Sequence, residues 1–221
     1  MNYKINNRFS IDVGFLVNYE HIRKSIIQTN DILSNLPSTL FNSIDYKTTS
    51  AMIGSIYCDT LALLTNSIVN PIEKGHPDIL PKSALNATEE RLRNYPQGLE
   101  IKCTVGNITT GANLRAGQNR IDYINGITWQ AHHQEVSTLM GLVWDFVDSG
   151  KTFFYPTITA VFYCNNLTPA DWGAVSGTTG RNTKVSGMLT SGKRKMASGW
   201  IAVIDNPKYI HTYGKVLSFN L

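Results

Sequence analysis

The sequence predicts an α/β protein in which helices flank a mixed central β-sheet. Two segments early in the chain, at about residues 19–33 and 46–66, carry apolar residues at helical spacing. Later segments, at residues 99–105, 139–147 and 157–163, are rich in strand-forming residues. Helices followed by several strands in a chain of this length predict one sheet with helices packed against it.

The two helices have recognisable ends. The first carries Ile22, Ile26 and Leu33 on its apolar face, and Pro37 lies just beyond its end. The second begins near Tyr46 or Lys47, where hydroxyl side chains offer caps. Its apolar positions are Ile53, Ile56, Tyr57, Leu61 and Leu64.

The strands differ in pattern. Residues 99–105 alternate apolar and polar side chains, which is typical of a strand with one buried face. Residues 139–147 are almost entirely apolar, which predicts a central strand buried on both faces. Ile79–Leu80 is short and ends at Pro81, and strands are also expected at 199–204 and 215–219.

The intervening segments are shorter or irregular. We expect a helix within residues 128–135 and a short helical or exposed segment at 88–93. Three glycines mark a long loop after residue 105: Gly106, Gly111 and Gly117.

Length and composition favour one soluble domain. A chain of 221 residues with 42% apolar and 16% charged residues is long enough for one core and too apolar for disorder. We expect a single domain, 1–221, with a mostly helical part (1–70), a central sheet (71–165), and basic loops with closing strands (166–221).

Several patterns predict a cytoplasmic location. The chain has no run of about eighteen apolar residues and no apolar stretch after its first charges, so we expect neither a membrane partner nor a signal peptide. The three cysteines lack CxxC spacing, which fits a reducing compartment: Cys58, Cys103 and Cys164.

The basic residues are unevenly distributed. Twenty Lys and Arg against sixteen Asp and Glu give a net charge of +4. Between Trp172 and Ile204 there is no acidic residue, although five basic residues lie there: Arg181, Lys184, Lys193, Arg194 and Lys195. Such a segment predicts a polyanionic partner.

Three residues carry the pattern of a catalytic centre. Asp78 precedes a short strand, and Glu100 and Lys102 lie two residues apart on the next one. Side chains two apart on a strand share a face, so a carboxylate and an ammonium would point into one cleft. A divalent metal held by carboxylates can neutralise a phosphate and activate a water molecule, so phosphodiester hydrolysis is the chemistry indicated.

This arrangement, Pro77-Asp78 followed by Glu100-x-Lys102, resembles the signature of the PD-(D/E)XK nucleases, and the chain length resembles that of type II restriction endonucleases. The resemblance covers about residues 47–163. It implies a restriction-endonuclease-like core and Mg²⁺ bound by Asp78 and Glu100, with help from the Ile101 carbonyl. Lys102 would orient or activate the attacking water and stabilise developing negative charge.

Members of the family often carry a further acidic residue on the preceding helix. Asp59 is the first candidate for this position and Glu73 the second.

The function implied by the resemblance is sequence-specific cleavage of double-stranded DNA. The products would carry 5′-phosphate and 3′-hydroxyl ends, and the enzyme would be a prokaryotic homodimer of a restriction–modification system. Two alternatives stay open: a repair or recombination nuclease that reads DNA structure, and a DNA-binding module without activity. In the second, Glu100 and Lys102 would be ordinary solvent-facing strand residues.

Two glycine-containing segments, 176–184 and 190–195, are expected to form loops that face DNA. Arg181 and Asn182 are candidates for base contacts. The candidates for phosphate contacts or general DNA binding in these loops are Lys184, Lys193, Arg194 and Lys195. A second set follows the 99–105 strand: Arg115, Gln118, Asn119 and Arg120. Solvated loops without a ligand are the alternative.

His132, His133 and Glu135 raise a third possibility, a zinc hydrolase acting on a small molecule. Adjacent histidines diverge on a helix, whereas helical metal sites use pairs four residues apart. This hypothesis is the least favoured, and the role of both histidines stays open.

Overall fold

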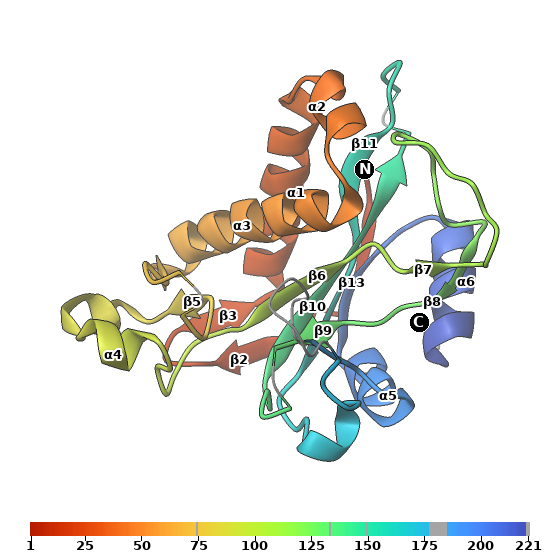
Figure 1. Cartoon of the computed structure of the whole chain (residues 1–221). Helices are drawn as coiled ribbons and strands as arrows, with labels where there is room; N and C mark the ends of the chain where they lie inside the picture. Colours follow the sequence, from red (N-terminus) through yellow and green to blue (C-terminus); the bar gives the residue numbers. More distant parts are fainter. Residues whose placement is uncertain (74, 133, 149, 177–184, 220–221) are drawn as a thin grey trace.

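A five-stranded mixed β-sheet crosses the middle of the molecule (Figure 1). In spatial order its strands are β1 (Tyr3–Ile5), β13 (Trp200–Ile204), β11 (Tyr155–Cys164), β10 (Leu139–Val147) and β6 (Ile101–Thr104). β6 and β10 are parallel, and the other neighbours are antiparallel. The prediction of an α/β protein with a mixed central sheet is confirmed. This computed structural model describes all residues except 74, 133, 149, 177–184 and 220–221.

The two longest strands form the centre of the sheet. β10 and β11 pair from Leu139 opposite Cys164 to Val147 opposite Tyr155. Every residue of β10 is buried, and so is nearly every residue of β11. Their continuous apolar sequences follow from this, because neither face of the two strands meets water.

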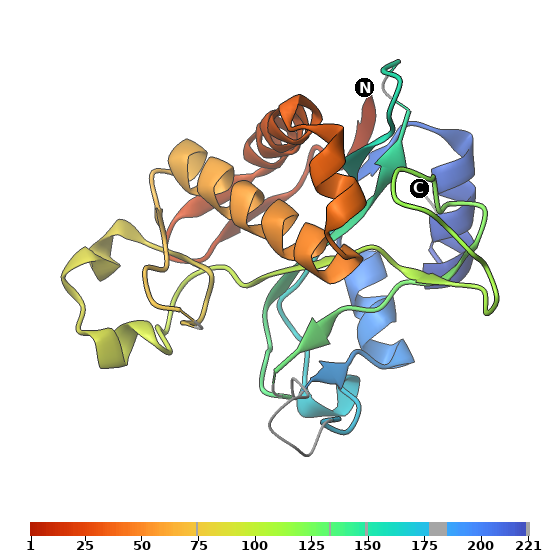
Figure 2. The same ribbon diagram turned by 45° about the horizontal axis from the view of Figure 1, so that its top comes forward.

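Three helices cover one face of the sheet: α1 (Tyr19–Asn35), α2 (Ser38–Ser43) and α3 (Tyr46–Thr65) (Figures 1 and 2). Asp45 caps α3 by accepting a hydrogen bond from the Thr48 backbone. The apolar faces of α1 and α3 pack against β10 and β11 in one core that includes Ile22, Ile26, Ile53, Leu61, Met140, Leu142 and Trp144. Burying each such side chain contributes about 1.5–3 kcal/mol.

The opposite face is covered by α5 (Thr190–Ser198), α6 (Pro207–Leu217) and two short strand pairs. The pairs are β7 (Asn107–Ile108) with β8 (Ile124–Gly126), and β9 (Gln130–Ala131) with β12 (Ser186–Gly187). A one-turn helix, η2 (Pro169–Asp171), precedes β12. A second core joins these elements to the sheet through Trp129, Val143, Phe162, Met196 and Tyr213.

A small outlying unit projects from the edge of the sheet near β6 (Figure 2). It contains β4 (Ile68–Val69), β5 (Ile79–Leu80), η1 (Lys82–Asn86) and α4 (Glu89–Leu92). Its own small core consists of Leu80, Ala84, Leu92 and Tyr95. The hairpin of β2 (Ser10–Asp12) and β3 (Leu16–Asn18) lies on the same side (Figure 1).

Two predicted elements were wrong in the last third of the chain. The segment 190–195, expected to be a loop, belongs to α5, because Met196 and Ala197 at its end are buried against the sheet. The strand expected at 215–219 is largely the end of α6, where Tyr209, Tyr213 and Leu217 lie four residues apart and are buried together. Tertiary packing overrides local strand propensity in both cases.

The helix expected within 128–135 is also wrong. β9 occupies that segment and pairs with β12, with Ala131 opposite Ser186. Trp129 is almost fully buried and donates its indole N–H to the Leu142 carbonyl. This anchoring keeps the backbone extended across the sheet.

Across the described residues, no helix combines the length and the apolar character needed to cross a membrane.

Candidate active site

The outlying unit brings Asp78 to the edge of the central sheet. The Ile79 backbone N–H donates to the Leu99 carbonyl at 3.1 Å, and the Leu99 N–H donates back to Ile79 at 2.9 Å. This antiparallel bridge sets Asp78 beside the start of β6, which carries Glu100 just before it and Lys102 within it. Residues more than twenty positions apart therefore meet, as the strand pattern predicted.

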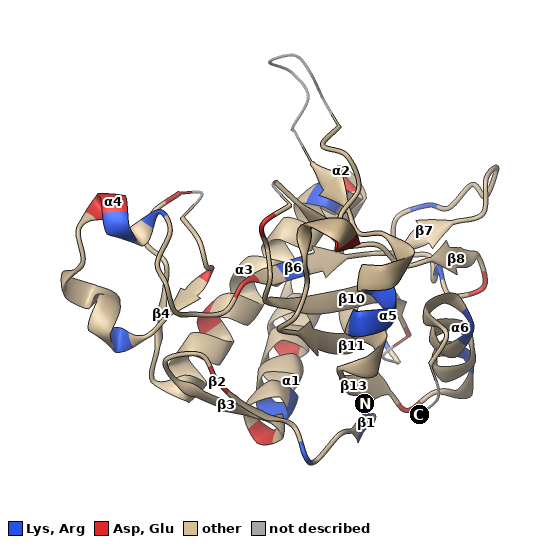
Figure 3. Cartoon of the chain, turned by 90° about the horizontal axis from the view of Figure 1, so that it is seen from below, with Lys and Arg blue, Asp and Glu red and all other residues tan. Residues whose placement is uncertain are grey.

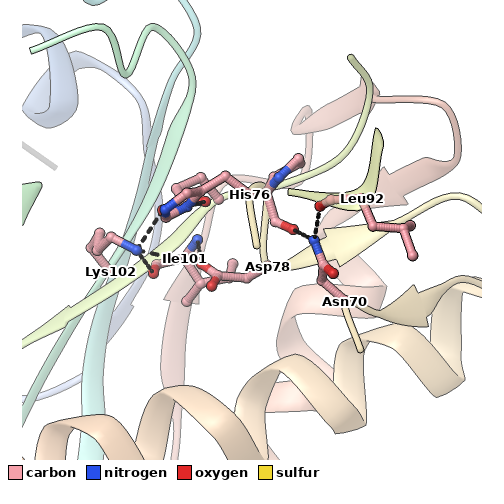
Figure 4. Close-up of polar contacts among 8 residues, drawn as sticks. Asn70, His76, Asp78, Leu92, Ile101 and Lys102 are labelled. Carbon is pink, nitrogen blue, oxygen red and sulfur yellow. Dashed lines mark hydrogen bonds and ion pairs between the residues drawn. The ribbon is translucent and has the colours of Figure 1, made fainter. Parts of the chain in front are cut away.

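The Lys102 ammonium is surrounded by three oxygens. Its Nζ atom lies 2.5 Å from Glu100 Oε1, 3.2 Å from the Ile101 carbonyl oxygen and 3.6 Å from Asp78 Oδ2. Figure 4 shows Asp78 and Lys102 converging beside Ile101. Two carboxylates thus share one positive charge within this group, which we call the Asp78–Glu100–Lys102 centre.

Asp78 is fixed by the backbone of β6. Its Oδ2 atom accepts a hydrogen bond of 2.7 Å from the Ile101 N–H. Burial raises the pKa of Asp78, and the negative charge of Glu100 raises it further. The carboxyl therefore lies where its own ionisation is opposed, which is common at functional sites.

Glu100 and Lys102 keep their charges. Burial opposes ionisation of Glu100, but the hydrogen bond with His76 and the charge of Lys102 outweigh it and lower the pKa. Burial likewise opposes the charged Lys102, but Asp78 and Glu100 together raise its pKa. Lys102 is consequently an ammonium at neutral pH.

His76 is a member of the site that the sequence did not indicate. Its Nδ1 atom lies 3.1 Å from Oε1 and 3.2 Å from Oε2 of Glu100, a position from which a protonated Nδ1 donates to the carboxylate. This contact raises the pKa of His76. The available signal was its place directly before Pro77-Asp78, although the contact with Glu100 spans 24 positions.

The loop that carries His76 and Asp78 is held by Asn70. The Asn70 amide donates to the carbonyl of Pro77 at 3.1 Å and to that of Leu92 at 2.9 Å (Figure 4). The His76 backbone pairs with residues 93–95, since Tyr95 N–H donates to its carbonyl at 2.7 Å. The loop is therefore tied on both sides.

A cleft of about 190 Å³ opens beside the Asp78–Glu100–Lys102 centre. His76 and Glu100 line it where it meets the centre. Its other walls are formed by residues 94–98 and 135–138. A ligand group bound in this cleft would lie next to any substrate at the centre.

The two candidates for an extra acidic ligand do not join the centre. Asp59 and Glu73 are both exposed, and neither forms an ion pair or hydrogen bond with other described residues. The neighbour of Asp59, Cys58, is buried instead. Burial, together with the nearby charge of Asp78, raises the pKa of the Cys58 thiol. At this point of α3 the helix turns a thiol, and not a carboxylate, toward β6.

Two of the predicted DNA-binding side chains are used inside the protein. The Asn119 amide donates to the Phe146 carbonyl at 3.1 Å and to the Tyr209 hydroxyl at 2.7 Å. Arg120 is 5% exposed, with its guanidinium 4.7 Å from the ring centre of Tyr46. Because Arg120 is enclosed, its predicted contact with DNA does not fit the structure.

The remaining DNA-binding candidates fall into three groups. Basic positions lie on α5 (Figure 3). Arg194 is exposed there and Lys193 is half-buried, whereas Lys195 is bound to Asp171 at 2.6 Å. Arg115 and Gln118 are exposed in the loop between β7 and β8, where the Gln118 side chain accepts from the Arg115 N–H. The other three candidates lie outside the described residues: Arg181, Asn182 and Lys184.

Among its described residues, the structure does not bring together a metal site from those on which the zinc hypothesis depends. His132 and Glu135 are exposed, Glu135 lines the cleft, and His133 lies outside the described residues. In the part of the chain that is described, no group of three or more His, Cys, Asp or Glu side chains is arranged to hold a metal ion.

Comparisons with protein families, with curated proteins and with solved structures gave no match to this chain.

Proposed function

We propose that this protein is a Mg²⁺-dependent endonuclease that hydrolyses phosphodiester bonds of double-stranded DNA at the Asp78–Glu100–Lys102 centre. The observation that carries the proposal is the ring of three oxygens around the Lys102 ammonium. Asp78 Oδ2, Glu100 Oε1 and the Ile101 carbonyl all lie within 3.6 Å of one positive charge. The same oxygens are those assigned to the metal by the resemblance to PD-(D/E)XK nucleases.

The residues present fit a magnesium ion. Mg²⁺ prefers oxygen ligands and is usually held by one or two carboxylates with water completing its shell. Asp78, Glu100 and the Ile101 carbonyl would hold it, and the ammonium shows that this group of oxygens accommodates a cation. When bound, the metal supplies Lewis-acid stabilisation of the phosphate and a more acidic water.

Lys102 acts as a charged donor in this proposal. Because the two carboxylates keep it protonated, it orients the attacking water by hydrogen bonding and stabilises the negative charge that develops on the phosphate. This role needs no deprotonation of Lys102.

His76 holds Glu100 in place. Its Nδ1 atom lies almost equally far from both carboxylate oxygens, so it fixes the plane of the carboxylate beside β6. Partners that orient a ligand in this way commonly affect metal affinity or activity by 10- to 100-fold.

Double-stranded DNA is the proposed substrate because of charge and resemblance. Arg194 and Lys193 on α5, with Arg115 in the loop between β7 and β8, offer basic groups outside the centre. The finer features come from the resemblance alone: sequence-specific cutting as a type II restriction enzyme, 5′-phosphate and 3′-hydroxyl products, and a homodimer in a prokaryotic cytoplasm.

The experiment is incubation of the purified protein with phage DNA in Mg²⁺ or in EDTA, followed by electrophoresis. Lys102→Ala tests the centre, and Lys208→Ala is the matched control, because Lys208 is an exposed lysine paired with Asp122. We expect discrete bands in Mg²⁺ from the wild type and the control, and none in EDTA or from Lys102→Ala. A smear would favour a nuclease that reads DNA structure, and intact DNA would favour a binding module without activity.

A further inference from the structure

The cleft beside the Asp78–Glu100–Lys102 centre has a composition that the proposed cleavage chemistry does not use. It is lined by two glutamates, Glu100 and Glu135, and one histidine, with no lysine or arginine. Apart from His76, which contacts Glu100, the lining offers no cation for a phosphate group. It suits an uncharged ligand that presents hydrogen-bond donors.

Four polar side chains of the lining are uncommitted. Asn94, Gln97, Ser137 and Thr138 line the cleft, and none of their side chains forms a hydrogen bond with another described part of the chain. Side-chain amides and hydroxyls both donate and accept hydrogen bonds. Pro77, Pro96 and Val136 add non-polar surface to the lining, against which a flat ring can pack.

The walls of the cleft are held firmly from behind. On one side, Tyr95 N–H donates to the His76 carbonyl, and Asn70 ties the adjoining loop. On the other, the Trp172 indole N–H donates to the Val136 carbonyl at 3.1 Å, and the Leu167 N–H donates to the Ser137 carbonyl at 3.0 Å. Polar groups on walls fixed in this way are preorganised for recognition.

The cleft lies next to the Asp78–Glu100–Lys102 centre. It shares Glu100 with this centre, and His76, which contacts Glu100, also lines it. Successive nucleotides of a strand are about 3.4 Å apart along the duplex, so the nucleoside next to a phosphate at the centre is within reach of a cleft that shares Glu100 with that centre.

We propose that this cleft is a subsite for the base of a nucleotide adjoining the cleaved bond, and that Asn94 and Gln97 read that base. The inference rests on the proposed nuclease function and adds to it a source of sequence preference close to the scissile phosphate. Asparagine and glutamine amides pair with adenine in particular, because both offer a donor and an acceptor side by side.

The first arm of the test measures base preference. The wild type, Asn94→Ala and Gln97→Ala cut a pool of duplexes randomised around the cut position, and the products are sequenced. Asn86→Ala is the control, because Asn86 is an exposed asparagine of η1 outside the cleft. We expect the cleft variants to lose preference at one adjoining position by about 10- to 100-fold, and the control to keep it.

The second arm measures DNA binding at the cleft in the absence of cleavage. The side-chain amide signals of Asn94 and Gln97, assigned in ¹⁵N-labelled protein by their loss in the variants, are followed while short random duplexes are added in Ca²⁺. We expect both signals to shift and the Asn86 signal to stay.

The two arms separate the possible failures. Cutting by the wild type with unchanged base preference in the cleft variants would overturn the subsite and leave the nuclease proposal intact. Shifted amide signals without any cutting would overturn the nuclease proposal and support the subsite as a nucleic-acid site. Neither cutting nor shifts would overturn both.

Discussion

Two lysine–carboxylate groups in this protein are built in different ways. At the Asp78–Glu100–Lys102 centre, two carboxylates compete for one ammonium. Elsewhere a single carboxylate, Asp171 of η2, is bound at 2.6 Å to Lys195 in the last turn of α5, and its Oδ2 atom also accepts from the Thr168 backbone at 2.8 Å.

The pKa values of the acids follow this difference. Burial opposes ionisation of Asp171, but Lys195 and the neighbouring hydroxyl and backbone donors outweigh it and lower its pKa to about 2. Asp78 is pushed in the opposite direction by burial and by Glu100. Asp171 thus has a cation of its own, whereas Asp78 shares Lys102 with Glu100, which His76 also contacts.

The largest expected difference between the two groups is the effect of replacing each lysine on the rate of DNA cleavage. We expect Lys102→Met to lower the rate of DNA cleavage about a thousandfold, because charge stabilisation at the phosphate is lost. Lys195→Met should cut at the wild-type rate at a temperature where it is folded. Initial rates on supercoiled plasmid in Mg²⁺ measure both, and equal rates for the two variants would remove the distinction.

Stability should show the reverse order. Lys195→Met leaves Asp171 enclosed without its cation, and we expect it to lower the free energy of unfolding by about 3 kcal/mol. Urea denaturation followed by circular dichroism measures the change. A loss as large in Arg194→Met, an exposed neighbour on α5, would show that the pair itself is not responsible.

Removing His76 should have a smaller effect on activity. We expect His76→Ala to weaken Mg²⁺ binding and slow cleavage by about 10- to 100-fold, because Glu100 loses the group that fixes its plane. Calorimetric titration with Mg²⁺ and cleavage rates report the two quantities. An unchanged Mg²⁺ affinity would show that His76 supports the loop but does not position Glu100 for the metal.

The two acids should also differ in their response to pH. The pKa of Asp171 is lowered, so its contribution of about 2 kcal/mol is present above pH 4 and is lost as pH falls toward 2. The pKa of Asp78 is raised, so its ionisation works against folding as pH rises. Asp171→Asn should therefore lose stability at neutral pH, whereas Asp78→Asn should lose none; denaturation at several pH values decides this.

Short-range patterns predicted that Asp78, Glu100 and Lys102 would lie close together, and the structure places them so. Glu100 and Lys102 lie on one strand, where spacing alone sets which side chains share a face, and Asp78 reaches them through one antiparallel bridge. The buried character of β10 followed from its apolar run in the same way.

Long-range contacts could not be predicted from the sequence. His76 meets Glu100 only because the outlying unit folds back on β6, and Arg120 is enclosed because a long loop returns beneath Tyr46. The helices at α5 and α6 were missed because packing against the far face of the sheet, and not local propensity, decides their structure.

The most direct test of the central claim is cleavage of supercoiled plasmid by the wild type and by Glu100→Gln, each in Mg²⁺ and in EDTA. Glutamine keeps the size of Glu100 and removes the charge that the proposed metal requires. We predict Mg²⁺-dependent conversion of the plasmid by the wild type and none by Glu100→Gln. Intact plasmid with the folded wild type, or equal cutting by both proteins, would contradict the account.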